Sequence, residues 1–240
     1  MSIDTDGRKV AVITGASQGI GAGLVEGYRK HGYAVVATSR GIESSQDPDV
    51  LTVRGDIADP ATAERVVAAA VERFGRVDTL VNNAGVFVAK PFTDFTLADY
   101  ELTTGVNLGG FFRITQLAVE RMLAQGGGGH VVQITTSLVD HADSAVTSVL
   151  ASLTKGGLQS ATKALAIEYA GRGIRSNAVA LGIVNTPMHP AEYHPTLAAM
   201  HPLGRMGEIS DVVEAVLYLE RSPFVTGDVL HVDGGQSAGR

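Results

Sequence analysis

A glycine-rich segment near the start of the chain has the residue types and spacing that bind the pyrophosphate of a dinucleotide. It follows an apolar run, Val10–Thr14, and precedes a helical pattern. Glycines let the backbone approach a pyrophosphate, and the free N–H groups and positive dipole end of the next helix stabilise its charge. Such turns are common, but the strand before and the helix after supply the required context. The residues expected at this site are Thr14, Gly15, Ser17, Gln18, Gly19, Ile20 and Gly21.

Further motifs follow in order along nearly the whole chain, from Lys9 to Gly235. Together with the glycine-rich turn they are Asn82-Asn83-Ala84-Gly85, Asn107, Lys155 and the turn Thr186-Pro187-Met188. The set resembles the short-chain dehydrogenase/reductase family. The resemblance implies NAD(P)-dependent carbonyl and alcohol chemistry on a seven-stranded sheet. It also implies a homo-oligomer, a tetramer or a dimer.

The resemblance assigns further cofactor contacts. By the family pattern, Asp56 and Ile57 hold the adenine, and the turn formed by Asn83, Ala84 and Gly85 passes beside the adenosine ribose. Thr186 bonds the nicotinamide carboxamide. Asp56 as a turn residue and Thr186 as a helix N-cap are the alternative interpretations.

The end of the second predicted strand bears on the choice between NAD and NADP. An acidic residue there accepts hydrogen bonds from a free ribose 2′-hydroxyl and repels a 2′-phosphate. This chain has Ser39 in that place, followed by Arg40. A guanidinium binds phosphate through two parallel hydrogen bonds, so the pair favours NADP(H) over NAD(H). Gln18 argues the other way, because many NADP-dependent relatives have a basic residue there, and Arg40 could also be a solvated side chain.

The resemblance also implies a set of catalytic residues, and this chain departs from that set at one position. The family uses a tyrosine as general acid and base, a lysine four residues later, a serine that orients the carbonyl and an asparagine that supports a relay water. Lys155 and Asn107 match, but the tyrosine position holds Ala151, and no tyrosine lies between Tyr100 and Tyr169. A methyl group exchanges no proton, and general acid catalysis contributes about 10²–10⁴-fold. The sequence therefore predicts a slow enzyme or another proton donor.

Several groups are candidates for the missing roles. For proton delivery we consider a water held by Lys155 and Asn107, or the loop side chains Tyr193 and His194. For the carbonyl-orienting hydroxyl we favour Ser137, with Thr136 as the alternative. Both lie slightly further from Ala151 than the family spacing, which implies a small insertion in the loop between them. Either hydroxyl could instead be an ordinary residue at a strand end.

Three functional hypotheses follow. The first is an NADP-dependent oxidoreductase that transfers hydride between the cofactor and a small carbonyl compound or secondary alcohol. The second, suggested by Ala151, is a dinucleotide-binding protein without redox turnover, such as a sensor or structural subunit. The third is a lyase, isomerase or imine reductase on the same scaffold. The presence of Lys155, Asn107 and Ser137 favours the first, because a sensor would not need all three.

The elements that must position these residues alternate along the chain. Near-continuous apolar runs, typical of strands buried on both faces, are Val10–Thr14, Ala34–Ser39, Val50–Asp56, Thr79–Asn83, His130–Thr135, Arg175–Ala180 and Val229–Val232. Helical patterns cover Ile20–His31, a segment that starts at Asp59-Pro60, Leu97–Gln125, Ser148–Ala170 and Ser210–Glu220. The alternation predicts a single α/β domain over residues 1–240, with a Rossmann-type, doubly wound parallel sheet of about seven strands and helices on both faces.

The segment 188–206 interrupts the alternation of strands and helices. It contains three prolines, and its length and irregularity predict a substrate lid, with a surface excursion as the alternative. Its histidines and His141 lack the spacing of a helical metal motif, so no metal site is expected.

Composition limits the partners and the compartment. The net charge of −6 and the absence of a basic cluster argue against nucleic acid and anionic membranes. The chain has no cysteine, which excludes disulfides and thiolate chemistry. Met1–Lys9 has no apolar stretch of the kind found in signal peptides, and no run is long enough to span a bilayer. We therefore expect a cytoplasmic enzyme whose partners are a small-molecule substrate and further copies of itself.

Overall fold

A seven-stranded parallel sheet forms the centre of the computed structural model, which describes residues 7–239; most of the Met1–Lys9 segment lies outside that range. The strand order is β3-β2-β1-β4-β5-β6-β7. The strands are β1 (Val10–Thr14), β2 (Ala34–Ser39), β3 (Val50–Arg54), β4 (Thr79–Asn82), β5 (Gly129–Thr136), β6 (Ile174–Leu181) and β7 (Val229–Val232). The order reverses between β1 and β4, which is where ligands bind in open α/β sheets. The predicted fold class is therefore confirmed.

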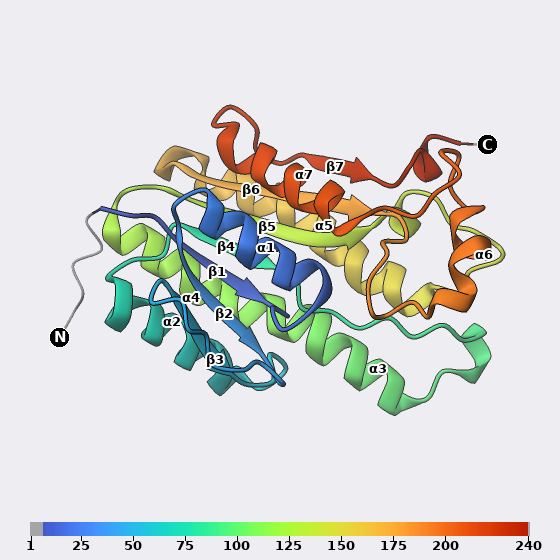
Figure 1. The fold of residues 1–240 in the computed structure, drawn as a ribbon, viewed down its shortest axis with the longest axis horizontal. Coiled ribbons are helices and arrows are strands. Elements are labelled where there is room, and N and C mark those ends of the chain that lie inside the picture. The colour runs from blue at the N-terminus through green and yellow to red at the C-terminus, as the bar shows by residue number, and fades with distance from the viewer. Residues whose placement is uncertain (1–6, 240) are drawn as a thin grey trace.

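Helices cover both faces of the sheet (Figure 1). Their bounds are α1 (Gly19–Lys30), α2 (Pro60–Phe74), α3 (Leu97–Thr104), α4 (Gly110–Gln125), α5 (Val149–Tyr169), α6 (His194–Ala198) and α7 (Ile209–Arg221). Helices α1 and α7 contact each other over one face, whereas α2 and α4 pack together over the other. In β1, Val10 and Val12 face the α2–α4 side, and Ala11 and Ile13 face the α1–α7 side. Burial on both faces explains why the strands read as continuous apolar runs.

Local signals set several helix boundaries. Asp59 caps α2, because its carboxylate accepts a hydrogen bond from the N–H of Ala61, and Pro60 occupies the first turn. The predicted helix Leu97–Gln125 is interrupted, since a π-helical segment at Gly105–Gly109 separates α3 from α4. The wider turn contains Asn107, whose side chain is fastened to a neighbouring loop. A helix-period pattern does not reveal such a bulge, because the interruption depends on a tertiary contact.

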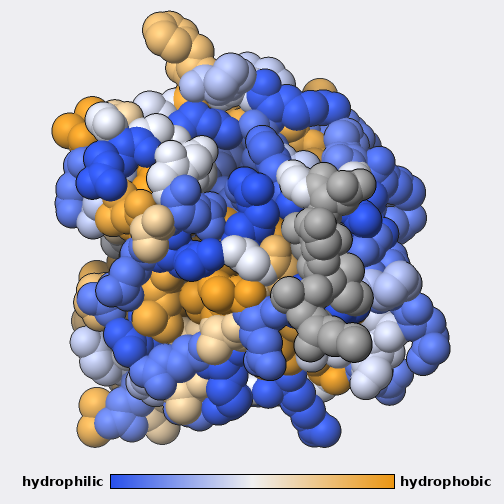
Figure 2. All heavy atoms as spheres, turned by 90° about the vertical axis from the view of Figure 1, so that its left-hand side faces the viewer, coloured by the Kyte–Doolittle hydropathy of each residue, from blue (hydrophilic) through white to orange (hydrophobic). Residues whose placement is uncertain are grey.

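A buried carboxylate fastens the amino end of the sheet, opposite the predicted cofactor site. Glu220 on α7 accepts hydrogen bonds from His130 (2.9 Å), Tyr33 (2.9 Å) and Thr79 (3.0 Å). Burial would raise the pKa of Glu220, but these hydrogen bonds outweigh it and lower the pKa to about 2. The face of the molecule drawn in Figure 2 is mainly hydrophilic, with a few apolar areas. Within residues 7–239, no helix combines the length and apolar character needed to cross a bilayer.

Candidate active site

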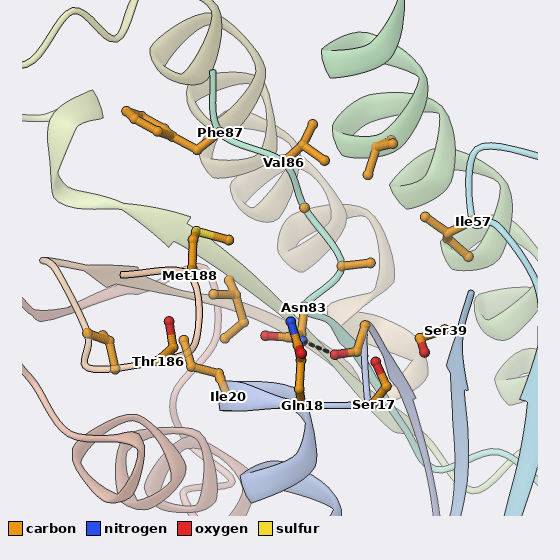
Figure 3. A pocket seen from close by; sticks show the side chains of 18 of the residues that line it. Ser17, Gln18, Ile20, Ser39, Ile57, Asn83, Val86, Phe87, Thr186 and Met188 are labelled. Carbon is orange, nitrogen blue, oxygen red and sulfur yellow. Dashed lines mark hydrogen bonds between the residues drawn. The ribbon is translucent and has the colours of Figure 1, made fainter. Parts of the chain in front are cut away.

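A cavity of about 680 Å³ opens at the carboxyl ends of the strands, at the switch point between β1 and β4. Ser17, Gln18 and Ile20 of the glycine-rich turn border it on one side, and Val86 and Phe87 on the other (Figure 3). Ser39 and Ile57 lie at one end of the cavity, whereas Thr186 and Met188 lie at the opposite end (Figure 3). The residues predicted for the two ends of a dinucleotide thus lie at the two ends of one elongated cavity.

Most of the predicted cofactor residues line this cavity. They are Gly15, Ser17, Gln18, Gly19, Ile20, Gly21, Ser39, Arg40, Asp56, Ile57, Asn83, Ala84, Gly85, Lys155 and Thr186. Thr14 is absent from the lining, because its side chain is buried behind the turn that follows β4. Its Oγ1 accepts hydrogen bonds from the N–H groups of Asn83 (3.0 Å) and Ala84 (2.9 Å). Thr14 therefore positions the wall of the cavity without contacting its interior.

The glycine-rich turn is held against the loop after β4. The Asn83 amide donates to the carbonyls of Thr14 (2.9 Å) and Gly15 (3.2 Å). Gly21 leaves no room for a side chain, since an added Cβ would lie 2.2 Å from the Gly15 oxygen. Gly19 has a φ of +56°, a conformation that favours glycine. This close packing holds the start of α1 at the edge of the cavity.

The end of the cavity that is predicted to hold the adenosine contains polar atoms without protein partners. Within the described residues, Thr38 Oγ1 and Ser39 Oγ are buried and make no hydrogen bond. Buried hydroxyls are normally paired, so two unpaired ones beside a cavity indicate a polar ligand. The Arg40 guanidinium lines the same end and forms no ion pair or hydrogen bond within residues 7–239. The Asp56 carboxylate is exposed and accepts a hydrogen bond from the N–H of Ala58 (3.0 Å).

Lys155 lies at the inner wall of the cavity. Its Nζ donates to the carbonyl of Ile134 at the end of β5, at 2.7 Å. Burial lowers the pKa of Lys155 to about 8. A Cβ on Gly85 would lie only 2.9 Å from this Nζ, so the ammonium also faces the loop after β4. Ala151 lies one helical turn earlier, is 2% exposed and lines the cavity. No tyrosine is found among the described residues that line it.

The side chain of Asn107 is fully engaged inside the protein. Its Oδ1 accepts from the N–H of Val86 (2.9 Å), and its Nδ2 donates to the Val86 carbonyl (3.1 Å) and to Thr154 Oγ1 (3.1 Å). Asn107 does not line the cavity. It therefore connects the π-helical segment, the loop after β4 and α5, and it fixes these three parts around Lys155.

Ser137, the favoured carbonyl-orienting hydroxyl, points away from the cavity. It is 1% exposed, and its Oγ lies 2.8 Å from Gln236 Oε1 and 3.2 Å from the Leu181 carbonyl. Ser137 thus holds the segment after β7 against the ends of β5 and β6. Thr136, the alternative, does line the cavity. The chain leaves β5 after Thr136 and enters a 3-10 turn at Ser137, so the two neighbouring hydroxyls have different surroundings.

The segment 188–206 contributes only its first residues to the cavity, Met188 and His189. Tyr193 is 54% exposed and is not part of the lining, and His194 Nε2 donates to the His189 carbonyl at 2.9 Å. Burial, followed by the nearby His194, lowers the pKa of His189. The sequence interpretation considered Tyr193 and His194 and missed His189, although His189 directly follows the Thr186-Pro187-Met188 turn.

Comparisons with known proteins agree with this geometry. A family model described as Enoyl-(Acyl carrier protein) reductase matches residues 15–237. The granaticin polyketide synthase putative ketoacyl reductase 2 of Streptomyces violaceoruber is 38% identical, over 98% of both chains. The solved structure titled ElxO with NADP Bound superposes with a TM-score of 0.90 at 29% identity, covering 97% of this chain and 100% of the other.

A second solved structure, a short-chain type dehydrogenase/reductase from Mycobacterium marinum, has a TM-score of 0.89 at 29% identity and covers 98% of both chains. The chain belongs to the short-chain dehydrogenase/reductase family and is an oxidoreductase. The relatives give no support to the alternative of a dinucleotide-binding sensor or structural subunit.

Proposed function

We propose that the protein reduces a small carbonyl compound with NADPH, or oxidises the corresponding secondary alcohol with NADP+. The single observation that supports this most is the elongated cavity, which has Ser39 at one end and Thr186 at the other (Figure 3) and is also lined by Arg40 and Lys155. When bound there, the nicotinamide cofactor supplies or accepts the hydride. The polyketide relative is named a ketoacyl reductase, which is consistent with carbonyl chemistry.

The residues of this chain bind the cofactor and orient the substrate. The N–H groups at the start of α1 face the pyrophosphate, and Ser39 and Arg40 bind the 2′-phosphate. Lys155 contacts the nicotinamide ribose, and Thr136, in place of Ser137, orients the substrate oxygen. Asn107 holds the loop after β4 and α5 together at this end. Ala151 takes the position of the family tyrosine, so the donor of the proton must be another group.

The substrate binds beside an apolar wall. Val86, Phe87, Ala151 and Met188 line the nicotinamide end of the cavity. A carbonyl with an apolar substituent fits this wall, because these side chains offer no hydrogen-bond partner to a polar substituent packed against them. The segment 188–206 closes over this end as a lid, with its far end anchored by His201, which is buried and accepts from the N–H of Ile183 at 2.9 Å.

The activity test follows the absorbance of reduced nicotinamide while the protein is mixed with a panel of aliphatic and aromatic ketones and aldehydes. We expect slow, carbonyl-dependent oxidation of NADPH. A protein that binds NADPH but oxidises it with no member of the panel would contradict the proposed reaction.

Arg40→Ala is expected to weaken NADPH binding about tenfold or more and to leave NADH binding unchanged. The reason is that a hydrogen bond to a charged group contributes about 1.5–3 kcal/mol, and only NADPH has the 2′-phosphate. Fluorescence titration of both cofactors measures this. Arg172→Ala, an exposed arginine distant from the cavity lining, is the matched control for the change in net charge. Equal losses for NADPH and NADH would refute the 2′-phosphate contact.

We also propose a homo-oligomer built through α3, α4 and α5. These helices expose large apolar side chains, among them Leu97 (71%), Phe112 (63%) and Ile167 (82%). Paired helices of this kind form an isologous interface. Light scattering is expected to give a multiple of 24.9 kDa, and Phe112→Asp combined with Ile167→Asp should lower it. A wild-type mass equal to the monomer would argue against the proposal.

A further inference from the structure

The nicotinamide end of the cavity lacks the proton donor that the family uses, because the methyl group of Ala151 exchanges no proton. Reduction of a carbonyl needs one proton at the oxygen for each hydride at the carbon. Among the described residues that line the cavity, the titratable side chains are Arg40, Asp56, Lys155 and His189. Arg40 and Asp56 follow β2 and β3, at the adenosine end. Lys155 and His189 are therefore the remaining candidates for proton exchange.

We propose that Lys155 itself exchanges the proton with the substrate oxygen, in place of the tyrosine that the family uses. This inference rests on the proposed carbonyl reduction. Lys155 Nζ has one protein acceptor, the Ile134 carbonyl at 2.7 Å, and forms no salt bridge within residues 7–239. An ammonium has three N–H donors, so two remain for ligands in the cavity. Ala151 lies one turn earlier on the same face of α5 and leaves no phenol between Lys155 and the cavity.

The neighbouring polar groups cannot take this role. The Asn107 amide is engaged with Val86 and Thr154. Thr136 lines the cavity, but a hydroxyl does not ionise near neutral pH. His189 is kept neutral by a lowered pKa, so it holds little of the imidazolium needed to donate a proton in reduction. Lys155 is the remaining group in the lining that is protonated at neutral pH and can release a proton when the oxygen becomes basic.

The surroundings of Lys155 explain why its ammonium is a usable acid. The groups packed around it are the Ile134 carbonyl of β5, Gly85 after β4 and Asn107 of the π-helical segment, none of which is charged. The Asp140 carboxylate is hydrogen-bonded to α5, but through Gln159, one turn further along the helix from Lys155. Burial without a countercharge lowers the pKa of Lys155 to about 8, whereas an exposed lysine has a pKa of about 10.4.

The proposed step transfers one hydride and one proton to the carbonyl group. The carbonyl carbon receives hydride from reduced nicotinamide as the C=O π bond breaks, and the oxygen takes one proton from Lys155 Nζ. The products are the alcohol, oxidised nicotinamide and a neutral amine, which water reprotonates. Reduction therefore needs the ammonium form and falls as pH rises through about 8, whereas alcohol oxidation needs the neutral amine and rises over the same range.

Two measurements test the proposal. The first is competitive acetylation of the free protein across pH with acetic anhydride, read by mass spectrometry, with exposed Lys163 on the same helix as the internal reference. We expect the reactivity of Lys155 to rise to a plateau with a midpoint near 8. A midpoint at or above that of Lys163 would overturn the proposal. This readout needs neither cofactor nor turnover.

The second measurement is the pH dependence of kcat for wild type, Lys155→Arg and His189→Asn. Lys155→Arg keeps the cation, but a guanidinium does not release its proton, so reduction should fall about 10²–10⁴-fold and lose the step near pH 8. His189→Asn should retain that step. Loss of the step in His189→Asn, or its persistence in Lys155→Arg, would overturn the proposal. A wild type that reduces carbonyls without any such step would contradict the role of Lys155 alone, whereas one that reduces none would contradict the proposed function as well.

Discussion

Replacing Ala151 by tyrosine is expected to raise kcat for carbonyl reduction by about 10²-fold. Residue 151 lies one helical turn before Lys155 and lines the cavity, so a phenol there would enter the site from the same face of α5. A nearby ammonium favours the ionised form of a phenol and lowers its pKa, so the new hydroxyl would act as a proton donor in addition to Lys155. The measurement is steady-state kinetics on one responsive carbonyl substrate.

Ala151→Phe is the matched control, because it adds nearly the same volume without the hydroxyl. We expect this variant to bind NADPH and to show no gain in kcat. Equal rates for wild type and Ala151→Tyr, with cofactor affinity and thermal unfolding intact, would contradict the expected gain and mean that Lys155 or another native group already supports proton transfer as well as a phenol does. Equal gains in the tyrosine and phenylalanine variants would attribute the effect to cavity shape and contradict the proton-donor explanation.

Gly21→Ala is expected to weaken binding of NADPH and NADH alike by at least about 100-fold. An added Cβ would lie 2.2 Å from the Gly15 carbonyl oxygen and 2.7 Å from Asn83 Nδ2. Backbone must shift to relieve the first contact, so the turn would move away from the loop after β4. The start of α1 would then no longer present its N–H groups to the pyrophosphate. Fluorescence titration with both cofactors measures the loss.

The control for this substitution is Gly127→Ala, in the turn before β5. A Cβ at Gly127 would meet no atom within 4 Å, and its φ is not in the left-handed region. Urea unfolding of both variants measures their stability. A Gly21→Ala protein that loses cofactor affinity but keeps its stability would show a local effect on the turn and not loss of the fold. Unchanged NADPH binding in a folded Gly21→Ala protein would exclude this turn as the pyrophosphate site.

The strands of the sheet could be predicted from residue types alone, because a strand buried on both faces is a short, nearly continuous apolar run. All seven predicted strands occur, and Asp59-Pro60 begins α2 as expected. Local chemistry also identified the glycine-rich turn. Its residues act through backbone conformation and close approach, which glycine spacing reveals directly.

Features that depend on contacts between distant segments could not be predicted in this way. Thr136 lines the cavity, whereas Ser137 Oγ bonds to Gln236, which lies 99 positions further along the chain. The π-helical segment around Asn107 depends on hydrogen bonds to Val86. The lowered pKa of Lys155 depends on burial without a countercharge. Residue types and local spacing determine which groups are present, but packing determines which way each side chain points and how strongly its charge is desolvated.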